Sequence, residues 1–150
     1  MQINCRSIKK NFDKLKLLLN QFPKPPDVIT LSETWINNPH LSKHFSINNY
    51  TLISHPRTNK KRGGGVAAYV SNKFPFTELS ELSNLLSTAC ENCVIELEMA
   101  QGPNIIIASV YKAPDVDISL FITTMCSFLD ELSTNNKSVF IAGEHEHKSA

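Results

Sequence analysis

The sequence predicts a single α/β domain with a mixed sheet, and its apolar pattern carries this prediction. Two segments, 8–22 and 118–132, place apolar residues at helical spacing. Several shorter apolar runs have the length and composition of strands, so strands outnumber helices. Each helix also leads into an apolar strand, a pattern typical of α/β folds rather than of helix bundles or all-β sandwiches.

Size and charge exclude several classes of protein. The chain has 150 residues, 41% of them hydrophobic and 19% charged, which suits one folded domain and not a disordered chain. A net charge of +1 provides no global attraction to nucleic acid or membrane, so any such attraction must be local. No apolar run approaches the roughly 20 residues of a membrane span, and the first residues lack a signal-peptide core. We therefore expect an intracellular, non-secreted protein with reduced cysteines.

The first half of the chain is expected to hold one helix and three or four strands. Ile3 could end a short strand. The helix over 8–22 has lysines opposite its apolar face and ends at the prolines of 23–26. A strand over 28–31 and a loop through 37–39 follow. Two further strands, 50–54 and 66–70, flank a basic loop that runs into three glycines. These glycines match neither a P-loop nor a dinucleotide fingerprint, so we expect them to serve close packing.

The second half is expected to hold a hairpin, a helix and a last strand. Residues 77–92 are polar and are predicted as loop. Strands over 93–99 and 104–111 form a hairpin around Gln101-Gly-Pro-Asn104. The helix over 118–132 leads into a buried strand, 138–142, which Gly143 is expected to end.

Cys90 and Cys93 form a lone C-x-x-C pair, which could be half a zinc site or a redox pair. A zinc site needs two more ligands at matching spacing, and a thioredoxin-like pair should open a helix. Here the pair leads into the alternating strand 94–98, so we expect a structural role.

Glu33 stands where an apolar strand gives way to a loop, two residues before the only tryptophan, Trp35. Open α/β sheets place their ligand sites at the carboxyl ends of strands. The alternative is an ordinary solvated acid at a strand-to-loop junction. The stretch alone does not decide between them.

Five segments, in order, extend this local signal along nearly the whole chain: Asn4-Cys-Arg-Ser7, Ser32-Glu-Thr-Trp35, Arg62-Gly-Gly-Gly-Val-Ala-Ala-Tyr69, Val110-Tyr-Lys-Ala-Pro114 and Ile141-Ala-Gly143. Each is weak alone, but the ordered set resembles the endonuclease/exonuclease/phosphatase superfamily, above all the endonuclease domain of non-LTR retrotransposons, which is related to apurinic/apyrimidinic endonucleases. The resemblance implies an α/β sandwich of two mixed sheets with outer helices, here as one incomplete domain over 1–150.

The resemblance also implies a chemistry. Such domains are hydrolases that nick target DNA in the nucleus with Mg²⁺ or Mn²⁺, use no small-molecule cofactor and accompany a reverse transcriptase domain. By position, Glu33 matches the metal-binding glutamate, and Asn4 matches the active-site asparagine beside the metal. Tyr111 matches the active-site tyrosine near the scissile phosphate. One or two carboxylates plus waters suit magnesium. The alternatives are a capping role for Asn4 and a plain sheet aromatic at Tyr111.

Basic residues are the expected contacts to the DNA backbone. Four of them crowd the loop before the glycines, and Lys112 adjoins Tyr111; the set is Arg57, Lys60, Lys61, Arg62 and Lys112. From charge alone, a solvated hairpin turn explains the loop as well.

Two departures from the family pattern argue against efficient catalysis. The usual Gly-Asp-Phe-Asn is replaced by Gly143-Glu-His-Glu-His147, which leaves Glu144 in the aspartate's place. A misplacement near 1 Å can cost about 10²-fold. The closing Ser-Asp-His motif has no counterpart, and losing its histidine typically costs about 10²–10⁴-fold. We therefore expect little or no nuclease activity, the alternative function being a non-catalytic nucleic-acid- or protein-binding remnant. His145 and His147 could join the adjacent glutamates in a metal cluster, but near a terminus disorder is expected.

Overall fold

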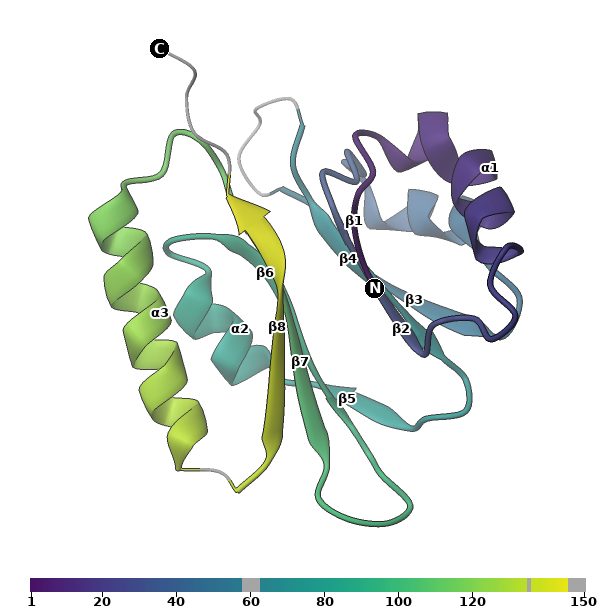
Figure 1. Ribbon diagram of the computed structural model, residues 1–150. Helices are drawn as coiled ribbons and strands as arrows, with labels where there is room; N and C mark the ends of the chain where they lie inside the picture. Colours follow the sequence, from purple (N-terminus) through teal and green to yellow (C-terminus); the bar gives the residue numbers. More distant parts are fainter. Residues whose placement is uncertain (58–62, 135, 146–150) are drawn as a thin grey trace.

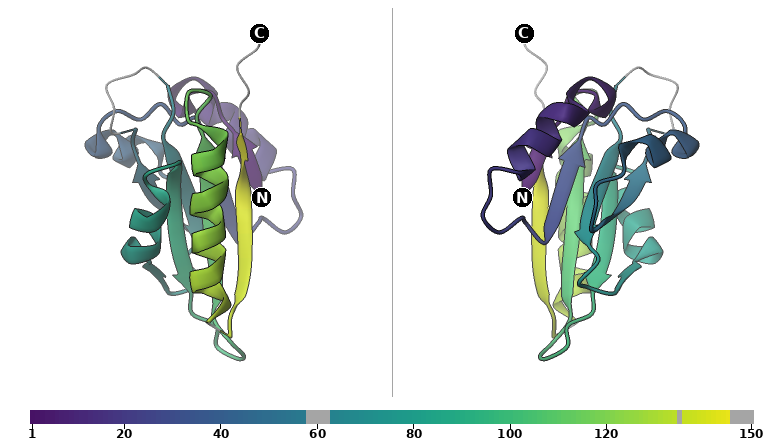
Figure 2. Two further views of the ribbon diagram at one scale, coloured as in Figure 1. Left: turned by 90° about the vertical axis from the view of Figure 1, so that its left-hand side faces the viewer. Right: turned by 90° about the vertical axis from the view of Figure 1, so that its right-hand side faces the viewer.

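The computed structural model describes residues 1–57, 63–134 and 136–145. Two four-stranded sheets pack face to face, and helices cover both outer faces (Figure 1). This confirms the predicted sandwich of mixed sheets with outer helices. Figure 2 shows α1 outside one sheet and α3 outside the other.

The first sheet has the strand order β1 (Gln2–Asn4), β2 (Val28–Ser32), β4 (Val66–Ser71) and β3 (Tyr50–His55). β1 runs parallel to β2, and the remaining pairs are antiparallel. Helix α1 (Ile8–Leu19) covers the outer face, where its buried Leu15 and Leu19 pack with Leu31 and Tyr69. With the second sheet against its other face, β2 is covered on both sides, and all five of its residues are buried.

The second sheet has the order β5 (Phe76–Glu78), β6 (Glu91–Leu97), β7 (Ile105–Lys112) and β8 (Ser138–His145). The predicted hairpin of β6 and β7 is antiparallel, and β8 joins β7 in parallel. Helices α2 (Ser80–Leu86) and α3 (Ile118–Ser133) cover the outer face, with Leu86 and Phe128 fully buried there. Asp117 begins α3 by accepting a hydrogen bond from the Leu120 amide at 2.9 Å.

The inner faces of the two sheets share one apolar core. Val28 and Val70 of the first sheet pack in one cluster with Cys93, Ile95 and Leu97 of the second. β2 lies against β7 and β8, and β4 lies against β6 and β7. This stacking brings the end of β2 to the ends of β7 and β8.

Two sequence-based predictions of local structure are wrong, and a third is incomplete. The loop expected at 37–39 is present at 37 and 38, but a 3₁₀ helix that was not predicted, η1 (Pro39–Phe45), begins at its last residue, and Asn38 caps it by accepting from the His40 amide at 2.9 Å. Residues 77–92, expected as loop, include β5, α2 and the start of β6. Gly143 does not end the last strand, because β7 continues to Lys112 and pairs with β8 as far as His145.

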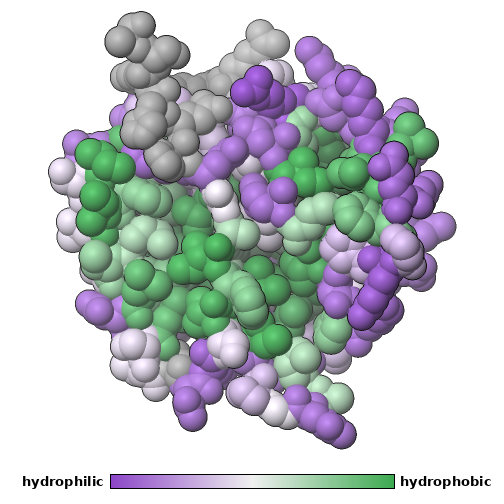
Figure 3. Space-filling model, in the orientation of Figure 1, coloured by the Kyte–Doolittle hydropathy of each residue, from purple (hydrophilic) through white to green (hydrophobic). Residues whose placement is uncertain are grey.

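β8 is the edge strand of the second sheet and carries exposed apolar side chains. Phe140 is 59% exposed and Ile141 is 41% exposed. Figure 3 shows apolar residues gathered across the middle of the face on which β8 lies. Within the part of the chain that the structure describes, no helix has the length and apolar character needed to cross a membrane.

Candidate active site at the ends of β2, β7 and β8

Glu33 lies in a sharp turn directly after β2. Its φ of 53° is left-handed, as is the φ of 55° at Trp35, a conformation that costs a non-glycine residue roughly 1–2 kcal/mol. Backbone hydrogen bonds hold the turn on both sides. The Ser7 amide donates to the Glu33 carbonyl at 2.9 Å, and the Thr34 amide donates to the Gly65 carbonyl at 3.1 Å. Strain held in place by such bonds is common at functional sites.

Gly65 lets the neighbouring loop approach this turn closely. Its φ is +84°, and a Cβ atom there would lie 2.6 Å from the Thr34 hydroxyl. A side chain is excluded on both counts. The expectation that this glycine serves close packing is confirmed.

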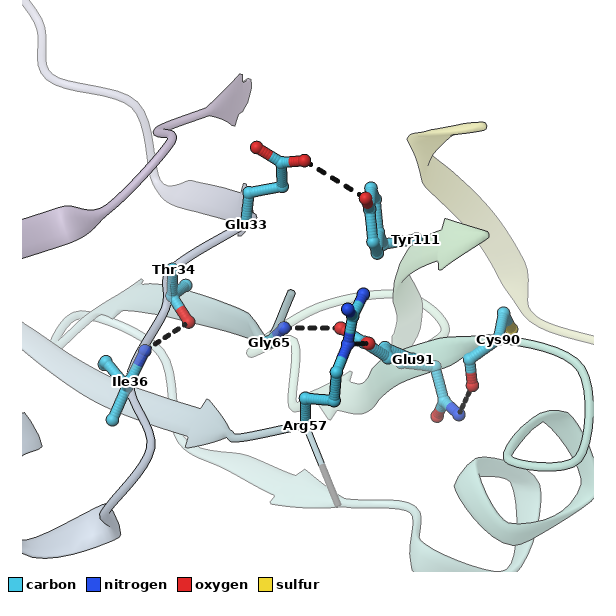
Figure 4. Close-up of polar contacts among 9 residues, drawn as sticks. Glu33, Thr34, Ile36, Arg57, Gly65, Cys90, Glu91 and Tyr111 are labelled. Atoms are coloured by element: carbon cyan, nitrogen blue, oxygen red, sulfur yellow. Dashed lines mark hydrogen bonds and ion pairs between the residues drawn. The ribbon is translucent and has the colours of Figure 1, made fainter. Parts of the chain in front are cut away.

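The structure brings together the four residues predicted for the active site. Asn4 is the register partner of Ser32 on the first sheet, and Tyr111 is the register partner of Glu144 on the second. Two hydrogen bonds join the sheets at this point: Tyr111 Oη donates to Glu33 Oε1 at 3.1 Å, and Ser32 Oγ donates to Glu144 Oε1 at 2.6 Å. In Figure 4 the Glu33 carboxylate and the Tyr111 hydroxyl face one another.

Ser32 is a residue of this site that the sequence reasoning missed. It is fully buried, it lies beside Asn4, and its hydroxyl anchors Glu144. Its position directly before Glu33, within the quoted Ser-Glu-Thr-Trp segment, was the available signal.

Cys5 packs beneath the site but stays a neutral thiol. Its Sγ donates to the Ser32 carbonyl at 3.3 Å. Burial raises the pKa of Cys5 to about 12, and the charges of Glu33 and Glu144 act in the same direction. A thiol does not suit Mg²⁺, which takes oxygen ligands.

The oxygen donors fit a hard divalent cation. Glu33 and Glu144 supply two carboxylates, and Asn4 supplies an amide whose Oδ1 accepts from the Arg6 amide at 3.1 Å. Magnesium takes one or two carboxylates and keeps several waters. Over residues 1–57, 63–134 and 136–145, no three His, Cys, Asp or Glu side chains group as a metal cluster, so an all-protein cage is not formed there.

Two of the five predicted phosphate contacts are turned inward. The Arg57 side chain, 12% exposed, pairs with Glu91, and Lys112, 5% exposed, donates its ammonium to the Ala113 carbonyl at 3.2 Å. This burial argues against phosphate contacts by either residue. Lys60, Lys61 and Arg62 lie outside the described residues.

The C-x-x-C cysteines lie in different cores. Cys93 belongs to the core between the sheets, whereas Cys90 packs under α2 and α3. Burial raises the pKa of each thiol to about 12. The two cysteines therefore have the properties of structural residues rather than of a redox or zinc pair. His147 and the side chain of His145 lie outside what the structure describes.

No protein-family model matches the sequence, and no curated protein matches it. The structure does match solved nucleases. The endonuclease domain of TRAS1, a telomere-specific non-LTR retrotransposon, gives a TM-score of 0.66 at 12% identity over 95% of this chain and 56% of that one. The Xenopus laevis APE2 catalytic domain gives 0.66 at 16% identity over 95% and 56%, and the AP endonuclease LMAP from Leishmania major gives 0.64 at 17% over 95% and 53%. The chain thus spans about half the length of these neighbours.

Proposed function

Starting from the fold that the chain shares with the endonuclease/exonuclease/phosphatase superfamily, we propose that it carries a metal-dependent site for phosphodiester hydrolysis in DNA. One observation carries the proposal. The Tyr111–Glu33 hydrogen bond of 3.1 Å joins the ends of β7 and β2, at the place where Asn4 and Glu144 also lie. Four residues that are far apart in sequence and suited to one reaction thus meet at one end of the sandwich.

Each residue has a role that its chemistry allows. Glu33, assisted by Asn4, would hold Mg²⁺ or Mn²⁺, and the ion when bound supplies Lewis-acid stabilisation of phosphate charge. Tyr111 donates its hydroxyl to the Glu33 carboxylate, which it would orient, and the family resemblance gives it a place near the scissile phosphate. Glu144 is the group that would orient or deprotonate the attacking water.

Glu144 also explains why we expect turnover to be slow. Its carboxylate is one methylene further from the backbone than the aspartate's, and the Ser32 hydroxyl holds it at 2.6 Å. A general base displaced by about 1 Å loses about 10²-fold in rate. We therefore propose a site that binds the cation and DNA but cleaves poorly.

DNA is the proposed substrate, and the loop over 57–62 is its proposed backbone contact. With Arg57 engaged by Glu91, the remaining candidates are Lys60, Lys61 and Arg62. Replacing these three by alanine should weaken binding about equally across DNA sequences. The salt slope should fall by roughly 0.9 per lost duplex-phosphate contact. An unchanged salt slope would support the alternative that the loop is a solvated hairpin turn without phosphate contacts.

The retrotransposon neighbour extends the proposal to a biological setting. By analogy, target-site nicking would take place in the nucleus, in concert with a reverse transcriptase domain. This part of the proposal rests on the likeness of folds and on the ordered motifs.

The deciding experiment separates cation binding from cleavage. Mn²⁺ binding to the 150-residue chain should be lost in Glu33→Gln, and any nicking of supercoiled plasmid with Mg²⁺ should be lost in Glu33→Ala. Glu144→Asp should speed nicking if the extra methylene limits turnover. Undiminished Mn²⁺ binding in Glu33→Gln would refute the site. DNA binding without nicking in all variants would favour the non-catalytic remnant.

A further inference from the structure

An ion pair between Arg57 and Glu91 lies beside Tyr111. Glu91 is the register partner of Tyr111 on the adjacent strand, and Arg57 follows the end of β3. The two side chains are only 12% and 19% exposed. A pair so shielded is less screened by solvent than a surface ion pair.

Glu91 uses both of its carboxylate oxygens. One Glu91 carboxylate oxygen accepts from Arg57 Nε and the other accepts from the Gly65 amide. The Arg57 guanidinium carbon lies 6.0 Å from the centroid of the Tyr111 ring, within cation–π range. Burial opposes the charged guanidinium, but the hydrogen bond and charge of Glu91, followed by the influence of Tyr111, raise the pKa of Arg57.

These contacts close a ring around the Glu33 turn. Tyr111 holds the Glu33 carboxylate, Arg57 lies over the Tyr111 ring, and Glu91 joins Arg57 to Gly65. The Gly65 carbonyl then accepts from the amide of Thr34, the residue after Glu33. Figure 4 marks three contacts of this ring: Tyr111 with Glu33, Arg57 with Glu91, and Glu91 with Gly65. The pair therefore acts on Glu33 by two routes, through its carboxylate and through its backbone.

From this ring we infer that Arg57 and Glu91 are positioning residues, which hold Tyr111 and the glycine turn so that the Glu33 carboxylate stays oriented toward a divalent cation. The inference rests on the proposed function. It replaces the phosphate-contact role that sequence reasoning gave to Arg57. Residues that orient a metal ligand without touching the metal typically change affinity or activity by about 10–100-fold when they are removed.

The main test removes the pair without changing net charge. In Arg57→Gln/Glu91→Gln one positive and one negative charge are lost together, so a change in cation affinity cannot come from net charge. We expect the Mn²⁺ dissociation constant, measured on the folded protein by electron paramagnetic resonance, to rise by about 10–100-fold.

The matched control is a second neutral pair. Lys137 and Glu96 are joined at 2.6 Å and are also partly shielded. Glu96 lies on β6 and Lys137 directly precedes β8, and in the described part of the chain no contact joins them to the ring residues. The double variant Lys137→Gln/Glu96→Gln should lose stability in thermal unfolding and keep its Mn²⁺ affinity. A merely structural role for Arg57 and Glu91 would give the same result as this control.

A conservative variant keeps the inference falsifiable if the double variant does not fold. Arg57→Lys keeps the charge but loses the planar group over Tyr111 and the Nε contact. We expect its Mn²⁺ affinity to fall severalfold, less than in the double variant. A folded Arg57→Gln/Glu91→Gln, or failing that a folded Arg57→Lys, with wild-type affinity would overturn the inference. Unchanged Mn²⁺ binding in Glu33→Gln would instead overturn the proposed function itself.

Discussion

Gly143 offers a sharp test of how β8 is held against β7. It is the register partner of Val110 in the parallel pair, and its φ is not in the left-handed region. A Cβ atom at this position would overlap the Val110 carbonyl oxygen and lie 2.8 Å from the carbonyl carbon. All of these are backbone atoms of a central strand, so no side chain can rotate away to relieve the clash.

The expected cost of Gly143→Ala follows from this geometry. Overpacking a well-packed site typically costs about 1–3 kcal/mol. We place this variant near 3 kcal/mol, because the ladder itself must shift. In a domain of this size that corresponds to a fall in Tm of about 6–12 °C. The shift also moves the neighbouring Glu144 away from Ser32, so any nicking activity should fall with stability.

Thermal unfolding followed by circular dichroism measures this effect, with Gly102→Ala as the matched control. Gly102 has a φ of +83° but nothing within 4 Å of an added Cβ, so its replacement introduces backbone strain without a clash. It should cost only about 1–2 kcal/mol. If Gly143→Ala unfolds at or above the Tm of Gly102→Ala, the close approach of β8 to β7 is not as described.

Three further outcomes follow from the surface and the buried ionisable groups. Phe140→Lys, on the exposed edge strand β8, should reduce self-association, measured as concentration-dependent light scattering. Leu17→Lys on α1, at a side chain that is 63% exposed, should have little effect. Equal effects of the two variants would mean that the added charge alone is responsible. With the pKa of the three buried thiols raised to about 12, a disulfide reagent at pH 8 should label only the exposed Cys126 rapidly, and a second fast thiol would contradict this burial. Hydrogen bonds from Lys137 and then Asn104 lower the pKa of Glu96 below its ordinary 4.5, so its stabilising contribution is present above that pH and is lost as the pH falls through the lowered value. Glu96→Gln should flatten the acid side of a plot of Tm against pH, while the exposed Glu98→Gln should leave it unchanged.

Local pattern in the sequence was sufficient for the strongly periodic elements. Helices α1 and α3 and strands β2, β4, β6 and β7 were predicted close to their observed bounds, because hydrophobic periodicity reports directly which face of an element is buried. It was overlooked for α2, where Leu79, Leu82 and Leu86 recur at helical spacing among polar residues, and it cannot mark β5, which has only three residues. These elements form because β5 pairs with β6 and Leu86 is buried beneath α2, and both contacts are tertiary.

The same division holds at the candidate site. The ordered motifs were enough to name Asn4, Glu33, Tyr111 and Glu144 as candidates, since residue type and strand-end position are properties of the sequence. The hydrogen-bond partners of these four residues, in contrast, were decided only by the packing of one sheet on the other. The Ser32–Glu144 bond joins residues 112 positions apart, and the Arg57–Glu91 pair joins residues 34 positions apart. A basic residue in a loop looks the same in sequence whether it faces phosphate or a buried carboxylate. The difference is set by strand register and burial, which exist only once the two sheets have come together.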